Sequence, residues 1–81
     1  MKLRMCLAHP SKKGPIFIAK DNDGWFHVVY RGESLGAYPS AAMAIDDAAG
    51  GHTFTPSDGT DLGSLGLSND IGHWLPPGDF V

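Results

Sequence analysis

The chain has 81 residues, of which 42% are hydrophobic and 19% are charged, and its formal net charge is −3 at pH 7. This length allows one domain, and this composition is typical of a folded globule and excludes a chain that is disordered throughout. Cys6 is the only cysteine, which excludes an intramolecular disulfide and favours a reducing, cytoplasmic location. Since no apolar run has the length of a signal peptide core or a membrane span, we expect no contact with membranes.

The two halves of the chain carry opposite net charges. All six Lys and Arg residues lie within residues 1–38 beside three acidic residues, whereas residues 39–81 contain six aspartates and no Lys or Arg. Such an asymmetry predicts either a basic face beside an acidic one or two halves that interleave in the folded domain.

Residues 2–7 alternate apolar and polar side chains, which is typical of a strand. In residues 9–15, Pro10 precedes and Gly14-Pro15 follow a short polar stretch, and this pattern predicts a loop. Residues 16–20 form a short β-prone run before Asp21-Asn22-Asp23-Gly24, whose side chains and backbone freedom favour a tight hairpin turn.

Residues 25–31 and 34–38 follow as two further strands, joined by a turn at Arg31-Gly32-Glu33. These patterns predict a three-stranded antiparallel meander, or a four-stranded sheet if residues 2–7 join it. Along the middle strand, alternation places Phe26, Val28 and Tyr30 on a core face. We name the opposite side of the sheet the outer face, and alternation assigns Trp25, His27 and Arg31 to it.

The length of the second turn decides which side chains of residues 34–38 share a face. A two-residue loop directs Leu35 and Ala37 to the core and Tyr38 to the outer face, whereas a three-residue loop directs Tyr38 inward. We favour the two-residue loop because it buries Leu35.

Residues 40–51 predict an α-helix, in which Ser40 is the N-cap and Gly50 or Gly51 supplies the left-handed residue after the last turn. Small side chains let this helix lie close to the sheet. Its predicted apolar face consists of Ala41, Ala42, Ile45, Ala48 and Ala49.

Residues 52–81 are rich in Gly, Pro, Ser and Asp, yet they carry more large apolar groups than a disordered tail would. We expect an irregular but ordered segment, with a short helical turn capped by Ser68. This segment either covers the outer face and makes it a second core, or leaves that face free for a partner. Its large apolar residues are Phe54, Leu62, Leu65, Leu67, Ile71, Trp74, Leu75 and Phe80.

The sequence predicts no catalytic, cofactor or metal site. The turn at residues 21–24 fails the calcium-loop pattern, because Ala19 and Tyr30 would occupy ligand positions. The four histidines and Cys6 show no zinc-ligand spacing, and no nucleophile elbow or phosphate-binding loop is present.

The outer face is the best candidate for function, because Trp, Tyr and Arg are the usual anchors of interfaces. The same residue types on a sheet can also contact the phosphates and base edges of duplex DNA. We predict a small accessory or regulatory binding module that acts on a protein partner, with duplex DNA as the alternative. The predicted binding surface comprises Lys20, Trp25, His27, Arg31 and Tyr38.

The stretch WFHVVYRGESLGAYPSAAMAIDDAA resembles the AP2 domain, in its plant transcription-factor and phage or homing-endonuclease-associated forms. The resemblance covers residues 16–50, and its most specific part runs from Leu35 to Ala49. It implies a three-stranded meander, whose last strand ends in Leu-Gly-x-aromatic, followed by a short turn and an alanine-rich helix. It also implies DNA binding through the outer face, by Trp25, His27 and Arg31.

Taken together, these patterns predict an α+β domain spanning residues 1–81. We expect its core unit within residues 15–51, one helix packed on the sheet, and the irregular segment at residues 52–81.

Overall fold

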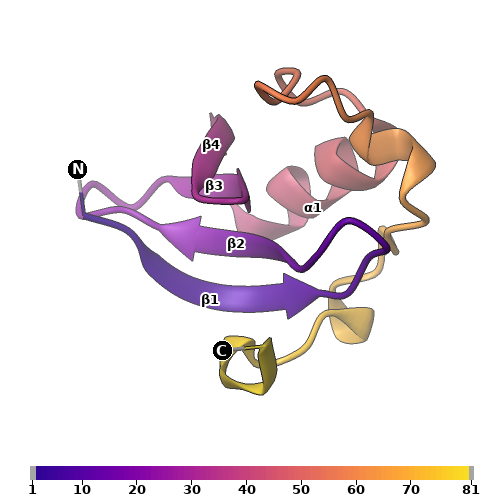
Figure 1. Ribbon diagram of the computed structural model, residues 1–81. Coiled ribbons are helices and arrows are strands. Elements are labelled where there is room, and N and C mark those ends of the chain that lie inside the picture. The colour runs from indigo at the N-terminus through magenta and orange to yellow at the C-terminus, as the bar shows by residue number, and fades with distance from the viewer. Residues whose placement is uncertain (1, 81) are drawn as a thin grey trace.

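The computed structural model describes residues 2–80, apart from the side chains of Asp79 and Phe80, so Met1 and Val81 lie outside the described part. One antiparallel sheet contains four strands in the order β1-β2-β3-β4, and the helix α1 packs on one of its faces (Figure 1). This arrangement confirms the predicted α+β class and shows that the N-terminal segment supplies a fourth strand. The elements are β1 (Arg4–His9), β2 (Ile16–Lys20), β3 (Phe26–Tyr30), β4 (Glu33–Tyr38) and α1 (Ala41–Gly50).

The two hairpin turns form as their local sequences predict. In the first, the Asp21 carboxylate accepts backbone N–H groups from Asp23 at 2.9 Å and Trp25 at 3.0 Å. In the second, the loop has two residues, Arg31 at φ 51° and Gly32 at φ 80°. Positive φ at both positions is the geometry that matches the twist of the flanking strands.

A β-bulge in β4 changes the faces that the sequence predicted for its last residues. Val29 pairs with Ser34 and His27 pairs with Ala37, so one residue of β3 faces two residues of β4, Leu35 and Gly36. Leu35 is buried in the core, as predicted. Beyond the bulge the alternation is inverted, so Ala37 lies on the outer face and Tyr38 shares the helix-facing side.

A second bulge lies in β1. Met5 pairs with Ala19 and Leu7 pairs with Ile18, so Cys6 is the extra residue. This bulge places Leu7 on the helix-facing side with Ile18, and Met5 on the outer face.

The helix α1 begins and ends as predicted. The Ser40 hydroxyl accepts the Met43 N–H at 3.2 Å, and Gly51 at φ 74° follows the last turn. The buried residues of the helix are Ala44, Ile45 and Ala48. Ala42 was predicted on the apolar face but is exposed, and Ala44 takes its place.

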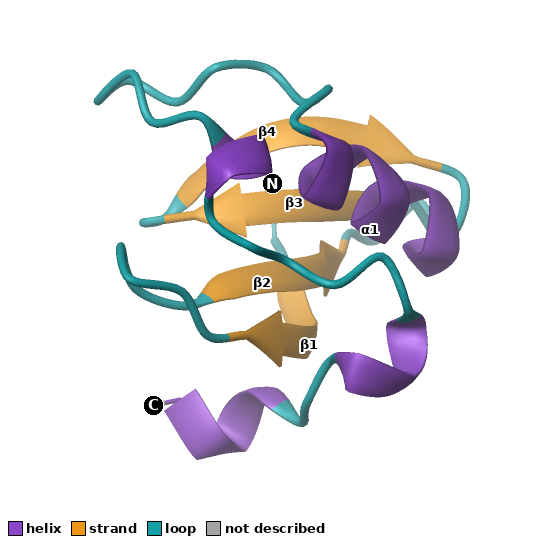
Figure 2. Ribbon diagram, turned by 90° about the vertical axis from the view of Figure 1, so that its right-hand side faces the viewer, coloured by secondary structure: helices purple, strands orange, loops and turns teal. Residues whose placement is uncertain are grey.

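The C-terminal segment completes the core on the helix-facing side of the sheet. Figure 2 shows it running across the same face as α1, through the short 3-10 helices η1 (Leu62–Ser64) and η2 (Ile71–His73). Four of its buried side chains join one cluster with the apolar residues of the strands and helix, namely Leu62, Leu65, Leu67 and Trp74. This part of the segment packs on the helix-facing side, although Ala19, His27 and Val29 on the outer face are buried as well.

The end of the segment protects the edge of the sheet. Leu75 and Ala8 exchange two backbone hydrogen bonds of 2.8 Å, and η3 (Pro77–Phe80) lies beside β1. An occupied edge limits uncontrolled pairing with other strands. Across residues 2–80, no helix has the length and apolar character needed to cross a membrane.

Candidate functional site

The structure divides the five predicted surface residues among three places. Trp25 and His27 lie on the outer face, as predicted. Lys20 and Tyr38 both pair with Phe26, so they lie on the helix-facing side, and their predicted outer position is wrong. Arg31 is in the β3–β4 turn, at the opposite end of the sheet from Trp25.

His27 lies on the outer face but is buried, so it offers little surface to a partner. Its Nε2 is 2.8 Å from Asp21 Oδ2, and its Nδ1 is 2.9 Å from the Ser34 hydroxyl. The side chains of His27 and Asp21 are each only 6% exposed. The hydrogen bond from His27 is the main cause that lowers the pKa of Asp21 below its ordinary value of 3.8, and burial opposes it.

The network of Asp21, His27 and Ser34 has the composition of a hydrolytic triad, and Ser34 is exposed. Catalysis would also need a substrate cavity and donors for a developing oxyanion. Three of the most pronounced cavities in residues 2–80 are lined by neither His27 nor Ser34. The network instead ties the β2–β3 turn to β4 across β3.

Tyr38 connects β4 to the helix. It packs against the hydrophobic core, and its hydroxyl is close enough to Asp47 of α1 for that carboxylate to affect its titration. Burial, with the Asp47 carboxylate as the second cause, raises the pKa of Tyr38 to about 12. Its role in the fold is therefore a contact between sheet and helix.

Arg31 makes its contacts around the β3–β4 turn. Its guanidinium donates to the Lys13 carbonyl at 3.2 Å, lies 5.4 Å from the Tyr30 ring and is 3.9 Å from Asp58. The Tyr30 hydroxyl also donates to Asp58 at 2.8 Å. These contacts give Arg31 a structural role at this end of the sheet, although most of its side chain stays exposed.

The outer face retains one large exposed aromatic side chain. Trp25 is 47% exposed, whereas Trp74 is only 4% exposed and donates its indole N–H to the Ser68 carbonyl at 2.8 Å. Met5, which the sequence analysis did not select, also lies on the outer face and is 39% exposed.

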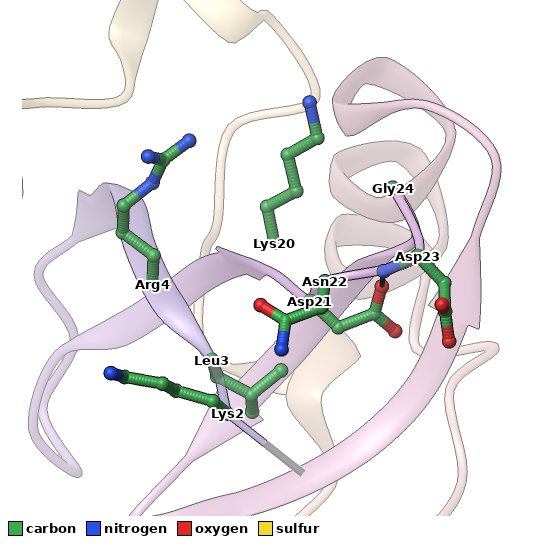
Figure 3. Close-up of a pocket in the computed structure, with 8 residues that line it drawn as sticks. All are labelled: Lys2, Leu3, Arg4, Lys20, Asp21, Asn22, Asp23 and Gly24. Carbon is green, nitrogen blue, oxygen red and sulfur yellow. Dashed lines mark hydrogen bonds between the residues drawn. The ribbon is translucent and has the colours of Figure 1, made fainter.

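An open cavity of about 640 Å³ lies at the same end of the sheet as Trp25, between residues 2–4 and residues 20–24 (Figure 3). It brings together the cations Lys2, Arg4 and Lys20. The carboxylates of Asp21 and Asp23 also line it, and Figure 3 shows them directed away from the three cationic groups.

The sequence analysis missed this cavity because its two walls are distant in the chain. Arg4 and Lys20 become neighbours only through the β1–β2 register. The alternation within residues 2–7 was the available signal, but the bulge at Cys6 conceals which side Arg4 occupies.

The described residues contain no group of three or more His, Cys, Asp or Glu side chains that could hold a metal ion. Comparison with known proteins adds no relative: no family model, no curated protein and no solved structure matches the chain.

Proposed function

We propose that this chain is a small, non-catalytic binding module, with an accessory or regulatory role in the cytoplasm. It contacts a protein partner through the end of the sheet that carries Trp25. The observation that carries this proposal is the exposure of Trp25 at this end of the sheet, while four apolar residues of the C-terminal segment pack on the helix-facing side: Leu62, Leu65, Leu67 and Trp74.

An exposed tryptophan is a large apolar surface in contact with water. Its burial in a complex would remove much of this surface from water, and tryptophan is among the residues most enriched at binding hot spots. The hairpin fixes the backbone of Trp25, because its N–H donates to the Asp21 carboxylate and its carbonyl accepts the Asp21 N–H at 3.0 Å. A fixed anchor loses little conformational freedom on binding.

Duplex DNA is the second candidate, supported by the resemblance to the AP2 domain and by the order of β2, β3, β4 and α1. Of the three residues that the resemblance assigns to DNA, His27 is buried and Arg31 lies in a turn. The net charge of −3 also gives little non-specific attraction to phosphates. A protein partner therefore has the stronger support.

The test places a photo-crosslinking amino acid at position 25 and, as a control, at position 43 in separate proteins. Met43 is a suitable control because it is an exposed apolar residue of α1. A protein captured only from position 25 is then purified and titrated directly against the parent chain. We expect Trp25→Ala to weaken that binding by about 2 kcal/mol or more, and Met43→Ala to leave it unchanged.

Circular dichroism should show that Trp25→Ala keeps the native fold, because the indole is not part of the core cluster. Equal binding by Trp25→Ala and the parent would refute the proposal. So would tight, salt-sensitive binding to duplex DNA that Trp25→Ala removes.

A further inference from the structure

We propose that the partner's contacting segment is an acidic peptide, and that one of its carboxylates binds between Arg4 and Lys20, which lie on the helix-facing side at the end of the sheet that carries Trp25. This inference rests on the proposed function, because it names the chemistry of the partner that Trp25 contacts. It concerns the cavity lined by residues 2–4 and 20–24.

Two positively charged side chains, Arg4 and Lys20, lie opposite each other on β1 and β2. Arg4 and Lys20 are direct partners in the β1–β2 register, so their side chains start from adjacent positions on the same face. Like charges directly opposite each other destabilise a sheet. Among the side chains that the structure describes, which do not include that of Asp79, no carboxylate lies within ion-pair distance of Arg4 or Lys20. A bound carboxylate would relieve this repulsion.

The carboxylates that line the cavity do not supply this compensation. Asp21 accepts hydrogen bonds from the Asp23 and Trp25 N–H groups and from His27. Its oxygens are thus occupied within the turn. Asp23 points away from Arg4 and Lys20 in Figure 3.

The position of Lys20 is held before any ligand arrives. Its ammonium group lies 5.4 Å from the centre of the Phe26 ring, which is a favourable cation–π distance. Arg4 offers a planar guanidinium that can bind both oxygens of a carboxylate. Figure 3 shows the Arg4 and Lys20 side chains extending in the same direction, whereas Lys2 points to one side.

The cavity favours an acidic peptide over a nucleic acid. Nucleic acids carry a charge on every nucleotide, so several phosphates would approach Asp21 and Asp23 as well as the cations. A peptide can direct one or two carboxylates to Arg4 and Lys20 and place neutral residues beside the aspartates. The volume of about 640 Å³ exceeds what one carboxylate needs and leaves room for neighbouring peptide atoms.

The first experiment uses the full chain, labelled with ¹⁵N, and a short synthetic peptide of alternating glutamate and serine. We expect amide signals of residues 2–4 and 20–24 to shift in a saturable manner, and the glutamine version of the peptide to cause no shift. Binding should weaken when the ionic strength rises from about 0.05 M to about 0.3 M, because the pairs are partly exposed to solvent.

The variant Arg4→Ala/Lys20→Ala should bind this peptide about tenfold more weakly or worse, because it loses two charge-assisted contacts. Lys12→Ala/Lys13→Ala is the matched control, since it removes the same charge at the loop between β1 and β2. It should bind within about twofold of the parent, because these lysines lie in the β1–β2 loop, at the opposite end of that hairpin from Arg4 and Lys20. The variant Arg4→Gln/Lys20→Gln also removes both charges, but its side chains are longer than alanine and keep more of the packing. Thermal melts should show that each variant is folded.

A partner found by crosslinking at position 25 separates the two proposals. Binding that is lost in both Trp25→Ala and Arg4→Ala/Lys20→Ala supports both. Binding lost in Trp25→Ala but kept in the double variant overturns this inference alone. Absence of any peptide shift, equal loss in the Lys12/Lys13 control, or stronger binding of a short duplex DNA at residues 2–4 and 20–24 would also overturn it.

Discussion

Asp21 joins the β2–β3 turn to the centre of the outer face. One carboxylate oxygen accepts two backbone N–H groups of the turn, and the other meets His27. Because these donors favour the ionised form, the pKa of Asp21 is lowered in the folded chain. Its contribution to stability is therefore complete above the ordinary value of 3.8 and is lost as the pH falls through the lower folded value.

We expect Asp21→Asn to reduce the urea midpoint at neutral pH and to differ less from the parent as the pH falls below 3.8. The reason is that the parent itself loses the ionised carboxylate in this range. Asp23→Asn is the control, because Asp23 is exposed in the same turn. The explanation fails if the two variants show the same profile of urea midpoint against pH.

Gly36 permits the bulge that turns Tyr38 toward the helix. Its φ is 144°, and a Cβ atom at this position would lie 3.1 Å from the Tyr38 hydroxyl oxygen. We expect Gly36→Ala to destabilise the chain by about 1–3 kcal/mol, since it adds backbone strain and crowds Tyr38.

Urea unfolding of Gly36→Ala and Gly78→Ala measures this cost. Gly78 has open space around its Cβ position, so its variant should remain close to the parent. Similar stability of the two variants would show that the bulge tolerates a side chain.

At the scale of the elements, the sequence predicted what local chemistry determines. Both turns, the Ser40 cap and the alternation along β3 depend on neighbouring residues, and all are confirmed. The bulges at Cys6 and Gly36 could not be predicted, because one extra residue inverts every later side chain at a small energetic cost. The bulge at Gly36 is the reason that Tyr38 was predicted on the wrong face of the sheet. The face of Lys20 follows from its pairing with Phe26 across the first hairpin.

The charge repulsion between Arg4 on β1 and Lys20 on β2 should lower the stability of the folded chain. Arg4 opposite Lys20 should be unfavourable, so we expect Arg4→Glu to stabilise the chain by about 0.2–1 kcal/mol at low salt. The gain should shrink in about 1 M salt, where screening is strong.

Thermal or urea unfolding at the two salt concentrations measures the effect of Arg4→Glu. Lys12→Glu makes the same charge change in the loop before β2, away from Lys20, and should give a smaller gain. An unchanged or reduced stability of Arg4→Glu at low salt would remove the repulsion argument on which the anionic site depends.

At the scale of the whole molecule, the opposite charges of the two halves are arranged around the sheet. Lys2, Arg4 and Lys20 gather at one end, whereas Arg31 lies at the other and approaches Asp58 of the C-terminal half. The halves therefore meet at one end, whereas at the other end the three cations line a cavity together with Asp21 and Asp23 of the same half. The sequence contained the charge asymmetry, but only the long-range pairing of strands decides where the cations meet.

The core also unites distant parts of the chain, so the molecule should unfold as one unit. Leu62 and Trp74 belong to the same buried cluster as Ile18, Val28 and Ile45. We expect the fluorescence of Trp74, measured in Trp25→Phe, to change at the same urea concentration as the far-ultraviolet circular dichroism of the sheet and helix. Coincident transitions are the signature of a two-state domain.

Leu62→Ala provides the stricter form of this test, because it removes a buried side chain contributed by the C-terminal segment. It should cost about 2–5 kcal/mol and move both transitions together, since sheet, helix and segment share the packing that is lost. If Trp74 instead responded at lower urea than the circular dichroism, residues 52–80 would form a separate, weaker unit. The core residues on the helix-facing side would then be exposed whenever that unit opened, and they would offer a further surface to a partner.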